Sequence, residues 1–181
     1  MPEKSPAELV EWYDKLAEGY DELYAEEQSL KYDAVLKAVG PRRFETVIDL
    51  ACGTGLFLER LRLICDFVVG VDVSRAMLLK ARERFRKAGF PLIRADCSAL
   101  PLRDGISDGV FSISLLEPGH SNTRKLEEMR RISAPSGVLV GTMFRAGTNQ
   151  RSMPSKGLDG EIVWLDLSSR EVLFLMHRAM L

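Results

Sequence analysis

Residues 47–55 read VIDLACGTG, and this stretch decides the fold. A short run of β-branched and apolar residues, 46–50, ends directly in a turn that contains two glycines. Such a run is typical of a strand buried within a parallel sheet. In doubly wound α/β folds, ligands bind at the carboxyl ends of the strands. The turn at residues 51–55 is therefore a predicted ligand site.

The segments that follow alternate between strand-like and helix-like patterns. The predicted strands are residues 67–72, 92–96, 109–116 and 138–144, and the predicted helices are residues 57–64, 74–88 and a segment around 126–132. This alternation predicts βαβ units and a parallel sheet with helices on both faces. Two further strand-like runs, 161–167 and 171–177, are separated by only three residues. A connection that short permits only an antiparallel hairpin.

The first forty residues have a helical pattern. The dipeptide Ser5-Pro6 predicts a helix start, and Gly40-Pro41 predicts a helix end. Apolar residues between these signals are spaced alternately by four and three positions, which places them on one helical face. They are Leu9, Tyr13, Leu16, Tyr20 and Leu23, and a second helical stretch carries Tyr32, Val35, Leu36 and Val39.

Composition and charge exclude several classes of protein. The chain has 181 residues, of which 46% are hydrophobic and 28% charged, and its net charge is −1. A charge near zero argues against a large nucleic-acid footprint, although Arg42-Arg43 and the stretch 124–131 supply local basic groups. The three cysteines form no C-x-x-C pair, so we expect no metal site. They predict buried thiols in a reducing compartment, and the charged N-terminus lacks a secretory pattern, so we expect a cytoplasmic protein without a membrane span.

The glycine turn favours a particular kind of ligand. Gly53 and Gly55 let the backbone approach a bound molecule closely. Leu58 stands where a dinucleotide fingerprint has glycine or alanine, and Asp49 would repel a pyrophosphate while suiting an amino group. The turn therefore favours an amino-acid tail over a dinucleotide. A nicotinamide dehydrogenase is the disfavoured alternative.

Two further acidic residues follow neighbouring strands. Asp72 ends the second predicted strand and Asp96 ends the third. A carboxylate at such a strand end can accept hydrogen bonds from ribose hydroxyls, or from an exocyclic amine such as that of adenine. Together with Asp49 they predict a site for a nucleoside joined to an amino acid. The alternative role for Asp72 and Asp96 is helix capping.

These residues resemble class I S-adenosylmethionine-dependent methyltransferases, and the pattern is nearest to the ubiquinone/menaquinone type. The matching stretches are VIDLACGTG (47–55), VVGVDVS (68–74), IRADCSALPLRDGISDGVFS (93–112) and RRISAPSGVLV (130–140). The stretch WYDKLAEGYDELY (12–24) is similar to the lid helix of that type. The resemblance implies an α/β fold with a doubly wound, seven-stranded, mostly parallel sheet and an antiparallel last strand. It implies one domain over residues 1–181, with lid helices at 1–40 and a Rossmann-like core at 44–181.

The resemblance also implies S-adenosyl-L-methionine as cofactor, S-adenosyl-L-homocysteine as product, and roles for particular residues. Those implied around the methionine portion are Asp49, Ala51, Gly53, Gly55 and Leu115, and Cys52 and Met77 are further implied cofactor contacts. Those implied around the adenosine are Asp72 for the ribose, Val73 at the adenine, and Asp96 and Cys97 at the adenine edge. Tyr13 and Tyr20 of the lid would close over the cofactor, and ordinary helix packing is the alternative for these tyrosines.

The loop after the fourth predicted strand bears on the choice of methyl acceptor. Relatives that methylate nucleobase or glutamine amino groups carry an Asn/Asp-Pro-Pro-Tyr/Phe motif, whereas this chain has LEPGH at 116–120, which argues against those substrates. If the acceptor must lose a proton, His120 is the first candidate for the base and Glu117 the second. The alternative for His120 is a helix cap near Ser121.

We therefore expect a methyltransferase that acts on an unidentified acceptor, with a small molecule favoured. Acceptor choice would come from the lid, the loop at 116–121 and the loop at 146–160, or from a second chain. The alternative is a cofactor-binding subunit that needs a partner chain to methylate RNA or protein. A homodimer, an activator subunit and a nucleic-acid substrate all remain open, and no membrane partner is expected.

Overall fold

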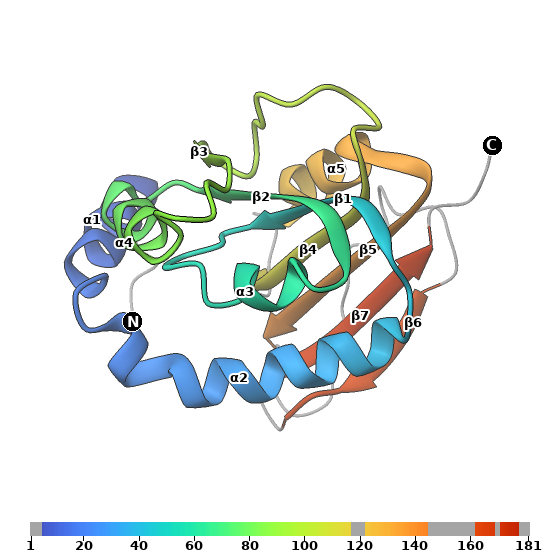
Figure 1. The fold of residues 1–181 in the computed structure, drawn as a ribbon, viewed down its shortest axis with the longest axis horizontal. Helices are drawn as coiled ribbons and strands as arrows, with labels where there is room; N and C mark the ends of the chain where they lie inside the picture. The colour runs from blue at the N-terminus through green and yellow to red at the C-terminus, as the bar shows by residue number, and fades with distance from the viewer. Residues whose placement is uncertain (1–4, 117–121, 145–161, 169–170, 178–181) are drawn as a thin grey trace.

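The computed structural model describes residues 5–116, 122–144, 162–168 and 171–177. In this part of the chain seven strands form one sheet, in the order β3-β2-β1-β4-β5-β7-β6 (Figure 1). The strands are β1 (Phe44–Leu50), β2 (Cys65–Asp72), β3 (Leu92–Arg94), β4 (Ser107–Leu116), β5 (Ser133–Phe144), β6 (Ile162–Asp166) and β7 (Glu171–His177). Strands β1 to β5 are parallel, and β7 runs antiparallel to both β5 and β6. The mostly parallel sheet with an antiparallel last strand is thus confirmed.

Helices cover both faces of this sheet, as Figure 1 shows. They are α1 (Pro6–Leu16), α2 (Tyr20–Val39), α3 (Leu58–Leu61), α4 (Arg75–Arg84) and α5 (Asn122–Ile132). On one face, α2 and α3 pack over a cluster that includes Val47, Val68 and Phe111 of the sheet. On the other, Leu126, Met129 and Ile132 of α5 pack over a second cluster. No helix in the described ranges is both long and apolar enough to cross a membrane.

The N-terminal segment forms two helices, so one apolar face does not run through it. Ser5 starts α1 with a capping box, in which the Glu8 amide donates to the Ser5 hydroxyl and the Ser5 amide donates to the Glu8 carboxylate. A turn at residues 17–19 then redirects the chain into α2. The prediction that Leu23 lies on the same apolar face as the residues of α1 is wrong. The Leu23 side chain is 65% exposed, because the turn interrupts the helical periodicity on which the prediction depended.

The second half of α2 belongs to the core. Tyr32 stacks on Phe57, with ring centroids 4.4 Å apart, and Val35 is fully buried. Gly40, with a φ of +72°, ends the helix as predicted. Only the first half of α2 therefore extends beyond the core in the way expected of a lid.

The predicted helix at residues 57–64 shortens to α3. Its last residues form tight turns, in which the amides of Leu63 and Ile64 donate to carbonyls three residues earlier. The helix is short because the chain must enter β2 at Cys65 directly afterwards. The next helix, α4, starts at Ser74 as predicted, with the Ser74 hydroxyl accepting from the Met77 amide at 3.1 Å.

Gly55 allows α4 to pack closely against the glycine turn. Its φ is +84°, and a Cβ at this position would lie 2.6 Å from Cε2 of Phe85. A side chain is thus excluded both by backbone conformation and by lack of space. The turn at 51–55 therefore lies directly against Ala81 and Phe85, at the C-terminal end of α4.

Candidate cofactor site

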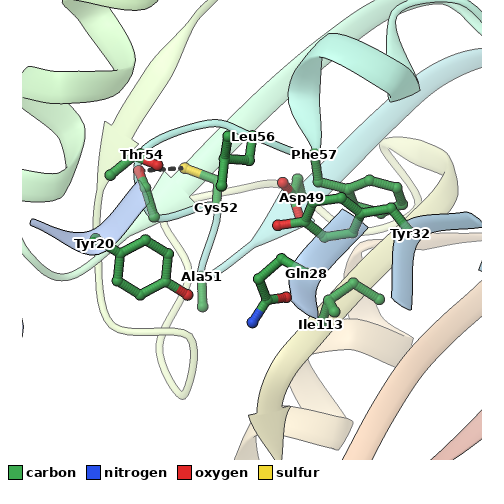
Figure 2. Close-up of a pocket in the computed structure, with 11 residues that line it drawn as sticks. Tyr20, Gln28, Tyr32, Asp49, Ala51, Cys52, Thr54, Leu56, Phe57 and Ile113 are labelled. Atoms are coloured by element: carbon green, nitrogen blue, oxygen red, sulfur yellow. Dashed lines mark hydrogen bonds between the residues drawn. The ribbon is translucent and has the colours of Figure 1, made fainter. Parts of the chain in front are cut away.

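A small cavity lies between α2 and the carboxyl ends of β1 and β4 (Figure 2). Its volume is about 20 Å³, which is room for a single water molecule. The lining residues come from α2, from β1 and the turn after it, and from β4. They are Tyr20, Gln28, Tyr32, Asp49, Ala51, Cys52, Gly53, Thr54, Leu56, Phe57 and Ile113.

Asp49 is the chemically unusual member of this wall. It is 2% exposed, and its Oδ2 atom accepts no hydrogen bond from any described residue. Burial, and then the nearby Asp72 carboxylate, raise the pKa of Asp49 well above its usual range. A buried carboxyl group without a partner costs free energy, and an ammonium group of a ligand would remove that cost. Asp49 therefore fits the amino end of an amino-acid tail.

Asp72 ties the glycine turn to the end of β2. Its two oxygens accept hydrogen bonds from the amides of Gly53 and Ser74, each at 2.8 Å. Burial raises the Asp72 pKa, and these backbone hydrogen bonds oppose that rise. Since each carboxylate oxygen has two lone pairs, Asp72 keeps acceptor capacity for the hydroxyls of a sugar.

The third predicted acidic residue follows β3. The Asp96 Oδ1 atom accepts from the amide and the hydroxyl of Ser98, both at 2.8 Å, and the residue is exposed. Its neighbour Cys97 is buried, and burial raises the pKa of that thiol to about 12. The structure thus places Asp49, Asp72 and Asp96 at, or just after, the ends of three adjacent strands.

Some of the other predicted residues line the cavity and others do not. Tyr20 lines it, together with Ala51, Cys52 and Gly53, and Figure 2 shows the Tyr20 hydroxyl directed toward Ala51. Those that do not line it are Tyr13, Gly55, Asp72, Val73, Met77, Asp96, Cys97 and Leu115. Leu115 packs against the second core cluster, whereas Ile113 faces the cavity. Both base candidates, His120 and Glu117, and the loop at 146–160 lie outside the described residues, so those assignments stay predictions.

Sequence reasoning missed part of the cavity wall. The missed residues are Gln28, Tyr32, Thr54, Leu56, Phe57 and Ile113. A signal for two of them was present, because Tyr20, Tyr24, Gln28 and Tyr32 recur at every fourth position of one helix. That spacing places them along one face of α2.

Two carboxylates hold the N-terminal helices over the site, and we call them the N-terminal clasp. The first, Asp14 of α1, accepts from the Ser74 hydroxyl at 2.5 Å and from the Ala76 amide at 3.0 Å. The hydrogen bond from Ser74 is the main cause that lowers the Asp14 pKa. Both contacts lie at the first turn of α4, beside the end of β2.

The second part of the clasp is Asp21 of α2. It accepts from the Thr54 hydroxyl at 2.5 Å and forms an ion pair with Arg84, which also donates to the Thr54 carbonyl. Ligand pockets in proteins usually measure about 300–1,000 Å³, far more than this cavity. The N-terminal clasp thus holds α1 and α2 close over the turn, and we expect a larger ligand to displace them.

A buried polar network borders the cavity at β4. Lys31 of α2 forms an ion pair with Glu171 of β7 at 2.7 Å, and it donates to the Ser114 hydroxyl at 3.1 Å. Ser114 adopts a positive φ of +59°, and Gln28 donates to its hydroxyl at 3.5 Å. This network ties α2 to the far half of the sheet. Within the described ranges, no group of three or more His, Cys, Asp or Glu side chains could hold a metal ion.

A family profile and several curated relatives match the chain. The profile of the methyltransferase domain family matches residues 48–141. A malonyl-[acyl-carrier protein] O-methyltransferase of Marinomonas sp. is 30% identical over 169 residues, which cover 91% of this chain and 58% of the relative. A demethylmenaquinone methyltransferase of Beutenbergia cavernae is 33% identical over 150 residues, 78% of this chain and 60% of the relative. The chain thus spans less than two thirds of the length of these relatives.

Solved structures share the fold. A DhpI–SAH complex has a TM-score of 0.73 at 18% identity, covering 94% of this chain and 95% of that one. The [4+2]-cyclase SpnF has a TM-score of 0.80 at 14% identity, covering 99% of both chains. A methyltransferase in complex with the Trm112 activator of Haloferax volcanii has a TM-score of 0.65 at 25% identity, covering 72% of this chain and 59% of that one. Since one of these neighbours is named a cyclase, the fold alone does not fix the reaction.

Proposed function

The chain belongs to the methyltransferase domain family, and we propose that it binds S-adenosyl-L-methionine and catalyses transfer of a methyl group to a small-molecule acceptor. The observation that carries this proposal is the buried Asp49, whose unpaired oxygen lies in the wall of a cavity bounded by the glycine turn. This cofactor supplies a methyl group already activated by a sulfonium charge. The protein's main task is then to position the acceptor.

The residues present fit the parts of this cofactor. Asp49 would pair with its ammonium group, beside Ala51, Cys52 and Gly53. The ribose would lie on Asp72, and the proposed adenine contacts are Val73, Met77, Asp96 and Cys97. Gly55 belongs to the proposed set as part of the glycine turn, and Leu115 as a residue near the end of β4. Tyr20 and Tyr13 would cover the cofactor once the N-terminal helices close. S-Adenosyl-L-homocysteine would leave by the same opening.

A small acceptor is favoured by charge and by relatives. The net charge of −1 offers little attraction to a nucleic-acid backbone. The relatives named above are called methyltransferases of malonyl-[acyl-carrier protein] and of demethylmenaquinone. We infer a cytoplasmic location from the three free cysteines, all of which are buried.

His120 is the proposed base for an acceptor that loses a proton, and Glu117 is the second choice. Replacing the imidazole should slow transfer without affecting cofactor affinity. His120→Ala is therefore expected to lower turnover at saturating cofactor while leaving the dissociation constant for S-adenosyl-L-homocysteine unchanged. Unchanged turnover would remove the base assignment and leave the proposed binding site intact.

A second candidate function is a cofactor-binding subunit that works only with a partner chain. The structural neighbour that forms a complex with a methyltransferase activator favours it. The two candidates differ in the activity of the isolated chain. Methyl transfer from labelled cofactor to a panel of small hydroxyl, carboxyl and amine acceptors supports the first, and binding without any transfer supports the second.

Cofactor binding itself is tested by calorimetric titration. We expect the chain to bind S-adenosyl-L-methionine and S-adenosyl-L-homocysteine and to bind NAD at least about tenfold more weakly, because Asp49 repels a pyrophosphate. Asp72→Ala should abolish binding of both adenosyl ligands. Absence of binding by the wild-type chain would overturn both candidate functions.

A further inference from the structure

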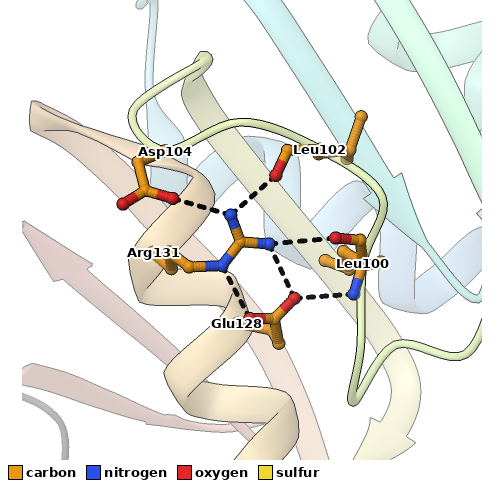
Figure 3. Close-up of polar contacts among 5 residues, drawn as sticks. All are labelled: Leu100, Leu102, Asp104, Glu128 and Arg131. Carbon is orange, nitrogen blue, oxygen red and sulfur yellow. Dashed lines mark hydrogen bonds and ion pairs between the residues drawn. The ribbon is translucent and has the colours of Figure 1, made fainter.

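Arg131, at the end of α5, holds the loop between β3 and β4 through its whole guanidinium group (Figure 3). It donates to the carbonyl of Leu100 at 3.0 Å and to the carbonyl of Leu102 at 2.6 Å. It also donates to the carboxylate of Asp104 at 2.7 Å. A planar fork of this kind fixes direction as well as distance, which a lysine cannot do.

Glu128, one turn earlier on α5, completes the arrangement. It accepts from Arg131 at 2.7 and 2.8 Å, and it accepts from the backbone amide of Leu100 at 2.6 Å. The Gly105 amide donates to the Arg131 carbonyl at 2.9 Å. Leu100 is thus held by both its amide and its carbonyl. We call Glu128 and Arg131 the α5 clamp.

The clamp reaches Asp96 through a short and ordered path. The Ala99 amide donates to the Asp96 carbonyl at 3.0 Å, and Ser98 donates twice to the Asp96 carboxylate. Cys97 and Leu100 are each 6% exposed and belong to the same core cluster. Of the three residues between Asp96 and Leu100, Ser98 and Ala99 are therefore held by their hydrogen bonds to Asp96, and Cys97 is held by burial.

We propose that Glu128 and Arg131 are positioning residues that set the Asp96 carboxylate for recognition of the adenine amine. The inference rests on the proposed function, in which Asp96 lies at the adenine edge. The loop at residues 95–106 has no helix or strand of its own, so its conformation depends on such outside contacts. Residues that hold a recognition group by hydrogen bonds restrict its position and orientation. Selectivity between similar ligands depends on that restriction.

The test compares two ligands that differ only at the adenine edge. S-Adenosyl-L-homocysteine carries the exocyclic amine, whereas S-inosyl-L-homocysteine carries a carbonyl oxygen there. A hydrogen bond to a carboxylate is stronger than one between neutral groups, so the wild-type chain should prefer the first ligand by about tenfold or more in calorimetric titration. Arg131→Gln should reduce this preference to about threefold or less. Glu128→Gln should do the same, and it serves as the second variant if Arg131→Gln does not fold.

The ratio of the affinities for the two ligands separates a positioning role from a general effect on stability. A structural defect weakens the binding of both ligands equally and leaves the ratio unchanged. That outcome would overturn the inference. Arg124→Gln is the matched control, because it removes the same charge from an exposed position of the same helix and should keep the wild-type ratio. Wild-type chain that binds both ligands equally would overturn adenine recognition by Asp96 while leaving cofactor binding intact. Wild-type chain that binds neither would overturn the proposed function itself.

Discussion

Asp21 of α2 accepts a hydrogen bond from the hydroxyl of Thr54, in the middle of the glycine turn. The contact joins a helix from the N-terminal segment to the loop expected to hold the cofactor. Arg84 strengthens it by pairing with Asp21 and donating to the Thr54 carbonyl. Because the cavity beneath has room for about one water molecule, we expect a cofactor to enter more readily once this contact breaks.

The first prediction concerns the rate of that opening. Asp21→Asn removes the charge that pairs with Arg84 and should favour the open arrangement. A partly exposed charged contact contributes about 1 kcal/mol, so the association and dissociation rates of S-adenosyl-L-homocysteine should both rise about three- to tenfold. Stopped-flow fluorescence of Trp12, in a Trp164→Phe background, measures these rates. Glu22→Gln, an exposed acid on the same helix, is the control, and equal rates in Asp21→Asn and wild type would contradict a clasp.

The sheet could be predicted from the sequence because its signals are local. Short β-branched runs, glycine turns and the capping residue Ser74 each act within a few positions, and the structure confirms the strands that they indicate. The clasp could not be predicted in this way. Asp14 contacts Ser74 and Asp21 contacts Thr54 across 60 and 33 residues. Nothing local distinguishes these two carboxylates from the other acids of the N-terminal helices.

The second prediction is that replacing Asp49 raises the stability of the fold and weakens ligand binding. Burial raises the Asp49 pKa above the unfolded value of about 3.9. In the pH range between these two values the folded chain binds more protons than the unfolded chain, so the free energy of unfolding falls as pH rises through it. Asp49→Asn does not titrate and escapes this loss. The variant should therefore melt above the wild type at pH 7.5, by about 2–4 °C for each kcal/mol gained, with a smaller difference near pH 4.5.

The same variant should bind S-adenosyl-L-homocysteine about tenfold more weakly or worse, because the ligand's ammonium loses its charged partner. Calorimetric titration at pH 7.5 and melting curves at both pH values test the two halves. A variant that melts higher and binds equally well would show that Asp49 does not contact the ligand. A variant that melts lower at pH 7.5 would show that the buried carboxyl stabilises the fold.

The third prediction separates the two glycines of the turn. At Gly55 an added Cβ meets Phe85 at 2.6 Å and φ is +84°, so Gly55→Ala should lower the free energy of unfolding by about 2–4 kcal/mol. At Gly53, with φ +56°, a Cβ meets no atom within 4 Å, so Gly53→Ala should lose only about 1 kcal/mol. Urea denaturation measures both losses, and equal losses would contradict the packing argument.

Gly53→Ala should instead weaken cofactor binding, because Gly53 lines the cavity and an added methyl group would take up open space beside it. Gly89 supplies a matched control. It has a φ of +67°, open space around its Cβ position, and no place in the cavity wall. Gly89→Ala should therefore show the same small stability loss with unchanged affinity for S-adenosyl-L-homocysteine. A Gly53→Ala variant with wild-type affinity would mean that the ligand does not approach this backbone.

The last prediction concerns the ion pair of Lys31 and Glu171, whose side chains are only 8% and 3% exposed. Removing one partner leaves a buried charge, so Lys31→Met should lower the free energy of unfolding by about 3 kcal/mol or more. The double variant Lys31→Met/Glu171→Leu should recover most of that loss, because no buried charge is left unpaired. Lys15→Met is the control, since its ion pair with Glu11 is exposed and contributes less than about 1 kcal/mol. Urea denaturation of the four proteins tests the pair, and a double variant as unstable as Lys31→Met would show that Lys31 acts through packing alone.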